Sequence, residues 1–496
     1  MKSYRAWSPD QPYLLPPSPR EWLPAGHLAF FILDLVRDLD LGAIEVELQS
    51  KESRGERPYS PVMMTGLLLY AYATGVFSSR GIERATVEDV AFRFLAASEQ
   101  PHFTTINQFR ARHRKALAEL FTQVLQACMS AGLVKLGHVA LDGTKMKANA
   151  SKHKAMSYDR LVADDAKLRA EVEALLLRAE QVDADEDERE GAYDPQEEIR
   201  RREERLAKLQ EAREALRRET AAARARKLRE QAEELRKKAT DPATAPRDQV
   251  GFPTIAGKRD EQAALLEERA KQASDENEPD DEDDDLPRGT PPSTPAGEPK
   301  PKAQRNFTDP QSRLMFRDGA FMQAYNAQLA VDEANQIIVA AALSNQGADN
   351  EYFGPMLRRV VDNCDAVPTC TTGDSGYFST ENVRLAERMG TLPVISVGKH
   401  LNSGSQREVA LTPQQQNPER VAMRAFLESP EGHALYARRK ATVEPVIGQI
   451  RTRGFQQLSF RGLFKNRCEW LFVAATHNLL KLWRAASRSR LQPAAA

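Results

Sequence analysis

The sequence is poor in cysteine and has no long apolar run, and each shortage excludes a class of protein. Its 496 residues include only 4 cysteines. Cys128, Cys364, Cys370 and Cys468 show no CxxC spacing, which argues against a zinc site or a disulfide framework and predicts reduced, buried thiols in an intracellular protein. Because the chain has no run of about 18 apolar residues and no signal-peptide pattern, we expect neither export nor a membrane span.

The net charge of -1 hides blocks of opposite sign. Residues 275–285 read DENEPDDEDDD, whereas residues 436–484 are basic and hold two acids, Glu444 and Glu469. A chain of this length, with 41% hydrophobic residues, can form the cores of two or three domains. The charge blocks predict that one part of the protein binds a polyanion while another part repels it.

The pattern of apolar residues changes along the chain and divides it into segments. Apolar residues recur at helical spacing before residue 130, and the run "LVKLGHVALDG" then indicates a buried strand that ends in an Asp-Gly turn. A charged segment with leucines seven residues apart predicts a long helix or helical hairpin; its acidic and Pro-rich end, from about residue 272 to 303, should be disordered. The expected segments are a helical, DNA-binding domain (1–130), the first strands of the core (131–151), a charged helical insertion (152–305), the remainder of the core (306–486) and a tail (487–496).

The last part of the helical region carries polar residues of a particular kind. "PHFTTINQFRARHRKALAELF" places Asn107, Arg110 and Arg112 in the first turns of a helix that Thr104 or Thr105 would cap. Amides and guanidiniums are the groups with which a recognition helix contacts base edges and phosphates. The alternative is a solvated polar face on an ordinary core helix.

Three acids occupy positions that suit a metal site. Strands that alternate with helices after residue 306 predict a mixed α/β sheet covered by helices. Asp142 in "VALDGT" and Asp374 in "TTGDSGYF" would end two of its strands, Glu444 stands in a basic helix, and Asp349 would cap another helix. Ligands bind at the carboxyl edge of such sheets, and Mg²⁺ prefers carboxylate oxygens. Either aspartate alone is typical of a turn, but the three acids together predict a metal-dependent nuclease site.

These stretches, with "TDPQSRLM", "YNAQLAVDE" and "YARRKATVEPVIGQIRTRGFQQLSFRG", resemble the DDE-type transposases of bacterial insertion sequences, and the likeness is closest to the eleven-eighty-two group. The resemblance implies an RNase H-like catalytic core of α/β class. It also implies that Asp142, Asp374 and Glu444 form the catalytic triad and bind two Mg²⁺ or Mn²⁺ ions.

The resemblance further implies that Tyr436, Arg439 and Arg451 match the tyrosine-arginine-glutamate-lysine signature of related transposases, on one helix with Glu444. Arg439 stands one residue further from the glutamate than usual, so Arg438 is an alternative, and Arg451 replaces the usual lysine. Two lysines beside Asp142 would line the DNA backbone path or form an ordinary solvated strand face. The expected DNA contacts are Tyr436, Arg439, Arg451, Lys145, Lys147, Asn107, Arg110 and Arg112.

The function that the resemblance implies is metal-dependent cleavage of insertion-sequence ends and strand transfer into target DNA. The partners would be the terminal inverted repeats, the target DNA and further copies of the chain, in a homodimer or larger assembly. The protein would act in the bacterial cytoplasm, at the nucleoid. One alternative is a catalytically inactive DNA-binding relic, and the presence of all three acids argues against such decay. The other is a non-enzymatic coiled-coil scaffold, which leaves the placement of the acids unexplained.

Overall fold

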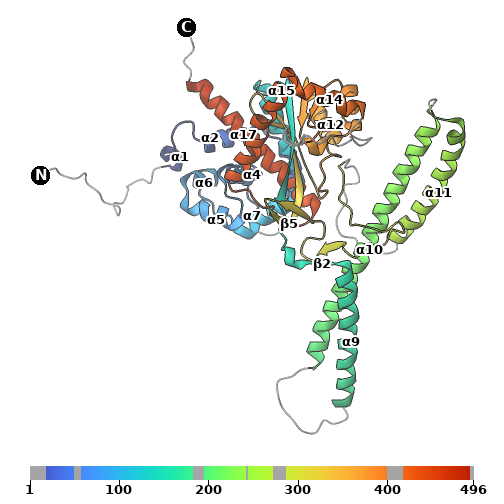
Figure 1. The fold of residues 1–496 in the computed structure, drawn as a ribbon. Coiled ribbons are helices and arrows are strands. Elements are labelled where there is room, and N and C mark those ends of the chain that lie inside the picture. Colours follow the sequence, from blue (N-terminus) through green and yellow to red (C-terminus); the bar gives the residue numbers. More distant parts are fainter. Residues whose placement is uncertain are drawn as a thin grey trace.

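The computed structural model describes residues 18–49, 57–182, 195–241, 244–271, 286–398 and 417–491. The chain forms a mixed α/β body with helices from its N-terminal region packed on one side, and two helical arms project from that body (Figure 1).

The central sheet mixes parallel and antiparallel strands, as the sequence predicts. The long strand β5 pairs antiparallel with β1, β4 and β6, while β7 lies parallel between β1 and β8. Strand β6 is buried along its whole length, which suits its apolar sequence "IIVAAALS". The strands are β1 (His138–Lys147), β4 (Arg313–Arg317), β5 (Ala320–Asp332), β6 (Ile337–Ser344), β7 (Cys370–Gly373) and β8 (Leu392–Ile395).

The Asp-Gly pair in β1 makes no turn, so the turn predicted at this pair is wrong. Strand β1 continues to Lys147, where it still pairs with Ala324 of β5. A Cβ atom on Gly143 would lie 2.4 Å from Nε2 of Gln328 and 2.9 Å from Oδ1 of Asp349. This glycine is therefore needed for the close approach of side chains and not for a bend in the backbone.

Helices cover the sheet and end the chain. The long α17 packs against β6, and its buried Asn478 accepts from the backbone N–H of Ile338 and donates to the carbonyl of the same residue, both at 2.8 Å. Trp470 on α17 is buried in the core. The helices are α12 (Phe353–Cys364), α13 (Thr380–Met389), α14 (Pro418–Glu428), α15 (Pro430–Thr442), α16 (Glu444–Thr452) and α17 (Leu463–Leu491), and the turn η2 (Ser375–Tyr377) follows β7.

The N-terminal helices share one hydrophobic core with the sheet, so they do not form a separately packed body. The predicted cap of α7 is wrong: His102 caps this helix, and Thr104 and Thr105 both lie inside it. None of the described helices is by itself long and apolar enough to cross a membrane; α4 and α5 pass that test only as a pair bent by 97°. The helices are α1 (Pro19–Trp22), α2 (Leu28–Asp38), α3 (Gly42–Gln49), α4 (Pro61–Thr74), α5 (Ser79–Glu88), α6 (Val90–Leu95), α7 (Phe103–Arg112) and α8 (Arg114–Ser130).

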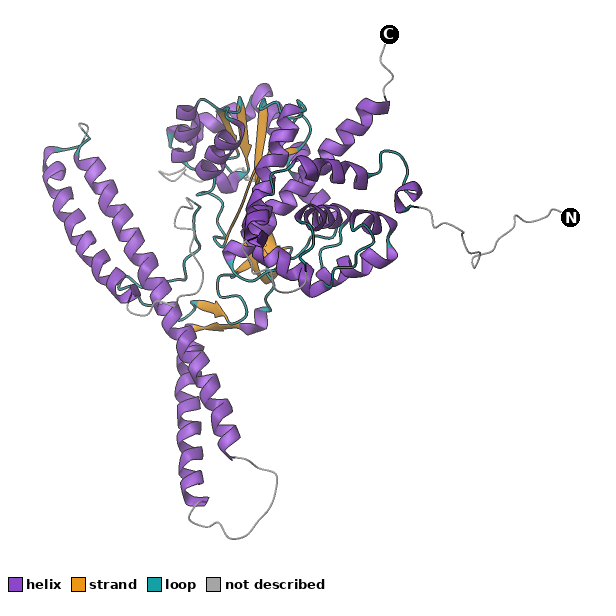
Figure 2. Cartoon of the chain, turned by 180° about the vertical axis from the view of Figure 1, so that it is seen from behind, coloured by secondary structure: helices purple, strands orange, loops and turns teal. Residues whose placement is uncertain are grey.

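The insertion forms two helical arms around one long helix, which confirms its predicted helical character. Figures 1 and 2 show α10 as the common spine, with α9 beside one half and α11 beside the other. Leu209 and Leu216, seven residues apart, are buried with Leu161 between α9 and α10, and Leu228 packs with Leu266 between α10 and α11. The elements are η1 (Lys152–Lys154), β2 (Ala155–Ser157), α9 (Tyr158–Val182), α10 (Pro195–Ala239), α11 (Pro246–Lys271) and β3 (Gln304–Asn306).

The Pro-rich end of the insertion is ordered from Leu286 to residue 303, which contradicts the predicted disorder there. Leu286 is buried in the main core, and Ser293 forms an antiparallel bridge with Pro299. Gly297, at positive φ, lies against Leu266 of α11. Other elements thus supply the apolar partners that this segment lacks on its own. Residues 272–285, with the acidic run, lie outside the described residues.

Candidate active site at the carboxyl edge of the sheet

The parallel pairing of β1 and β7 brings two of the predicted acids together. His138 is opposite Cys370 and Ala140 is opposite Thr372, so the same register carries Asp142 to the side of Asp374. Asp374 follows β7 directly, and its carboxylate accepts from the N–H of Gly376 at 2.8 Å. Asp142 lies within β1 rather than at its end, which corrects the predicted strand boundary.

Glu444 reaches the same edge from the helical layer. The predicted single helix is two helices, because Pro445 occupies the first turn of α16 and Val443 separates it from α15. Glu444 is thereby the first residue of α16, where the free N–H groups of a helix favour a carboxylate. Its side chain is about half exposed.

The guanidinium of Arg439, on α15, links two of the three acids. It lies 3.3 Å from Oδ2 of Asp142 and 3.4 Å from Oε1 of Glu444, and it is buried beside the ring of Tyr436. Burial raises the pKa of Asp142 to about 6; the charge of Arg439 opposes this shift, while Asp374 and Glu444 add to it. The described residues contain no group of three or more His, Cys, Asp or Glu side chains gathered as a metal site. A cation, Arg439, instead bridges Asp142 and Glu444.

Two further predicted residues lie close to this edge. Arg451 of α16 donates to the hydroxyl of Thr144, two residues beyond Asp142 on the same face of β1. The ammonium of Lys145, on the opposite face, lies 3.2 Å from Oδ1 of Asp349. Lys147 is exposed at the end of β1.

The residues predicted on α7 are separate from this site. Asn107 and Arg112 are exposed, and Arg112 pairs with Glu47. Arg110 is buried, and its guanidinium lies 3.0 Å from the carboxylate of Glu469 on α17. The structure therefore places Arg110 in a buried ion pair and not on an exposed face of α7.

Sequence reasoning missed the surroundings of Asp349. The carboxylate of Asp349 accepts from Nδ2 of Asn326 at 2.7 Å and from Nε2 of Gln328 at 2.8 Å, besides its contact with Lys145. Tyr352, and not Asp349, occupies the N-cap of α12. The signal was present in the sequence: two amides at alternating positions of the apolar strand "AYNAQLAV" must be paired when they are buried.

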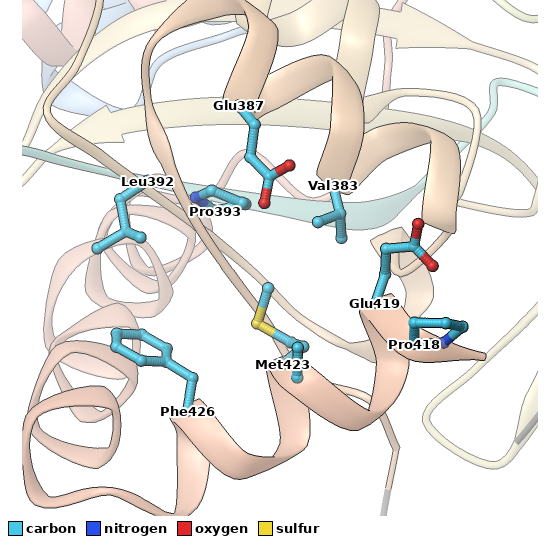
Figure 3. A pocket seen from close by; sticks show the side chains of 9 residues that line it. Val383, Glu387, Leu392, Pro393, Pro418, Glu419, Met423 and Phe426 are labelled. Carbon is cyan, nitrogen blue, oxygen red and sulfur yellow. The ribbon is translucent and has the colours of Figure 1, made fainter. Parts of the chain in front are cut away.

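An apolar cavity of about 360 Å³ lies elsewhere, between α13, β8 and α14 (Figure 3). Two carboxylates border it, and Glu419 is paired with Arg384. Acidic residues at its border do not suit the binding of a polyanion. Its lining consists of Val383, Glu387, Leu392, Pro393, Pro418, Glu419, Ala422, Met423 and Phe426.

A mixed sheet with two adjacent aspartates on β1 and after β7, and a helix-borne glutamate near them, agrees with an RNase H-like fold. Comparison with protein families agrees. The Transposase DDE domain matches residues 295–479, and the Transposase domain (DUF772) matches residues 17–112. The chain is a DDE transposase of the insertion-sequence type.

The DDE match includes Asp374 and Glu444, whereas Asp142 lies between the two matched segments. No curated protein and no solved structure matches the chain significantly. The assignment to the eleven-eighty-two group stays a prediction.

Proposed function

We propose that this transposase cleaves the ends of its insertion sequence and joins them to target DNA, with Asp142, Asp374 and Glu444 as catalytic triad. The observation that carries the proposal is the convergence of these acids. The register of β1 and β7 aligns the two aspartates, and one guanidinium contacts both Asp142 and Glu444. These three side chains come from distant parts of the sequence, and an ordinary turn does not require them to meet.

The donor set suits divalent metal ions. Carboxylate oxygens are hard ligands of the kind that Mg²⁺ and Mn²⁺ prefer. The guanidinium of Arg439 already lies between Asp142 and Glu444, so the space between these acids accepts a positive charge. When bound, such ions activate a water or 3′-hydroxyl nucleophile and stabilise the leaving oxygen. We propose two ions, held by the three acids.

The basic residues around the triad would hold the DNA strand. Arg439 and Arg451 present planar guanidiniums next to β1, and such groups bind phosphate oxygens bidentately. Tyr436 packs beside Arg439 and restricts its guanidinium. Lys145 is held by Asp349, so it contributes positive charge at a fixed place. Lys147 is free to turn toward the backbone of the substrate.

The N-terminal helices would recognise the DNA end. Asn107 and Arg112 lie exposed on α7, within the segment matched by the second transposase domain. An amide and a guanidinium on one short helix can contact base edges and phosphates. Because a transposon has two ends, we propose a homodimer or larger assembly that acts on DNA in the cytoplasm.

The test is cleavage of a labelled DNA fragment that carries the element's end, with Mg²⁺, with Mn²⁺ and with a chelator. Glu444→Gln should lower cleavage by at least about 1,000-fold, because a lost metal ligand removes several kcal/mol of transition-state stabilisation. Binding of the end in a gel shift should persist, since phosphate contacts dominate affinity. Glu431→Gln, in the exposed first turn of α15, is the matched control and should cleave normally.

The outcomes separate the candidate functions. Metal-dependent nicking by the wild type, lost in Glu444→Gln, supports the transposase reaction. Binding without cleavage in either metal would favour a DNA-binding relic. Absence of both binding and cleavage would favour a scaffold formed by the insertion.

A further inference from the structure

A cavity of about 680 Å³ lies at the end of β1, the strand that carries Asp142. Strand β1 leads to it directly: Lys147 lines the cavity and stands five residues, or roughly 17 Å along the strand, from Asp142. Hydrogen bonds fix its wall, because Asn149 donates to the carbonyl of Ser459 and Gln457 donates to that of Ala148. The cavity is part of the folded body and does not depend on the arms of the insertion.

The lining of this cavity is cationic. Lys147, Lys152, Lys154 and Arg461 contribute four positive charges, and His153 lies among them. Among the described residues that line it there is no carboxylate, and no described acid forms an ion pair with these four side chains. A concave surface of one sign concentrates an oppositely charged ligand. An anionic ligand therefore suits this cavity, and the phosphates of the DNA backbone are anions of this kind.

An aromatic side chain stands in the same cavity. Phe321 lines it and is 57% exposed, although phenylalanine is usually buried. Its cross-strand neighbour Phe316 is 59% exposed, and the two rings meet edge to face with centroids 5.1 Å apart. The turn between their strands is the two-residue kind, with Asp318 and Gly319 at positive φ. The ring of Phe321 is thus held in place by a tight hairpin and offers a face to a ligand.

The hairpin is also tied to the active-site strand, since Arg317 donates to the carbonyl of Lys145. We propose that this cavity binds an unpaired nucleotide of the DNA substrate, with its base stacked on Phe321 and its neighbouring phosphates neutralised by Lys147, Lys152, Lys154 and Arg461. The proposal rests on the proposed function, in that the ligand is DNA.

Physical chemistry favours this ligand over a protein surface. Sites for single-stranded nucleic acid combine a positive groove with aromatic rings on which bases stack. The core of a protein interface is depleted of lysine, yet lysines line the cavity around Phe321. A base inside a duplex is covered on both faces, so such a base can lie on the ring only after it has left the stack.

The experiment measures the affinity of a fluorescent single strand of about 12 nucleotides and of a blunt duplex, by anisotropy with a chelator present. Phe321→Ala should weaken single-strand binding by roughly 5- to 150-fold, the effect of losing one base stack. Phe321→Leu keeps an apolar side chain without a ring face and should weaken it similarly, while Phe321→Trp should retain affinity. Duplex affinity should not change in any of the three.

Leu314→Ala is the matched control, because Leu314 is exposed on the same face of the hairpin but does not line the cavity. It should bind both DNA forms like the wild type. The double variant Lys152→Gln with Lys154→Gln should reduce the slope of log affinity against log salt for single strands by about 0.7 per lost phosphate contact.

Equal single-strand affinity of the wild type and Phe321→Ala overturns the proposal, even if the wild type cleaves DNA. A change in oligomeric state in Phe321→Ala, with single-strand affinity unchanged, would assign the exposed rings to a protein contact and also overturns it. If the wild type does not cleave but single-strand binding still depends on Phe321, the proposed function fails and the nucleotide site stands.

Discussion

The buried ion pair between Arg110 on α7 and Glu469 on α17 offers a sharp test of how the N-terminal helices are held to the catalytic body. The two side chains are 7% and 1% exposed. Glu469 accepts from Arg110 at 3.0 Å, from the hydroxyl of Tyr72 at 2.8 Å and from the N–H of Ser459 at 2.7 Å. Removing one partner leaves a buried charge without compensation, which costs about 3 to 5 kcal/mol.

We therefore expect Glu469→Leu to lower the melting temperature of the folded body by roughly 6 to 20 °C, at about 2 to 4 °C per kcal/mol. The double variant Arg110→Met with Glu469→Leu removes both charges and should recover most of that loss. Arg112→Met is the control: its exposed pair with Glu47 is worth at most about 1 kcal/mol. Differential scanning calorimetry measures all four proteins. Equal shifts for Glu469→Leu and Arg112→Met would refute the reasoning, as would a double variant no more stable than the single one.

Three further predictions concern His477, Gly143 and Asp349. Burial lowers the pKa of His477 to about 3, below its unfolded value of about 6.5, so between these values the unfolded state binds a proton that the folded state does not bind. The free energy of unfolding should therefore fall by about 2 kcal/mol between pH 8 and pH 5. Urea titrations should show a shallower fall for His477→Gln. Gly143→Ala places a Cβ atom against Gln328 and Asp349 and should lower DNA cleavage at least about tenfold while a gel shift persists; Gly137→Ala, with open space around it, should cleave normally. Asp349→Ala removes an acceptor from the buried amides of Asn326 and Gln328 and should cost about 1 to 3 kcal/mol in urea unfolding, whereas an unchanged midpoint would contradict the contacts.

Local sequence signals predicted which elements carry the site, but they did not predict correctly where those elements end. The apolar runs before Asp142 and Asp374 are strands because both are buried in a sheet that helices cover. The end of β1 could not be predicted from the sequence, because an Asp-Gly pair forms a turn unless a partner strand holds it extended. That partner, β5, begins at Ala320, and the sequence between the two strands gives no sign of their pairing.

The position of Arg110 shows that the sequence has the same limit for candidate site residues. Asn107, Arg110 and Arg112 are equally suited to contact DNA by residue type, and helical spacing alone does not say which of them faces inward. The answer depends on Glu469, which is brought near only when α17 packs on the N-terminal helices. The position of Arg439 between Asp142 and Glu444 is likewise a product of how α15 packs on β1. The sequence supplied the residues, whereas the contacts come from tertiary packing.

The large insertion is compatible with an intact active site because its two ends are fastened together. Strand β2 leaves the core and β3 returns to it, and they pair antiparallel from Ala155 opposite Asn306 to Ser157 opposite Gln304. Figure 2 shows this small sheet at the base of the arms. Once β2 and β3 have paired, the two ends of the insertion are held together at the core. Extra residues between these strands then cost little free energy, because loop-closure entropy grows only logarithmically with loop length. The alignment of Asp142 with Asp374 follows from the parallel pairing of β1 with β7, and neither strand belongs to the arms.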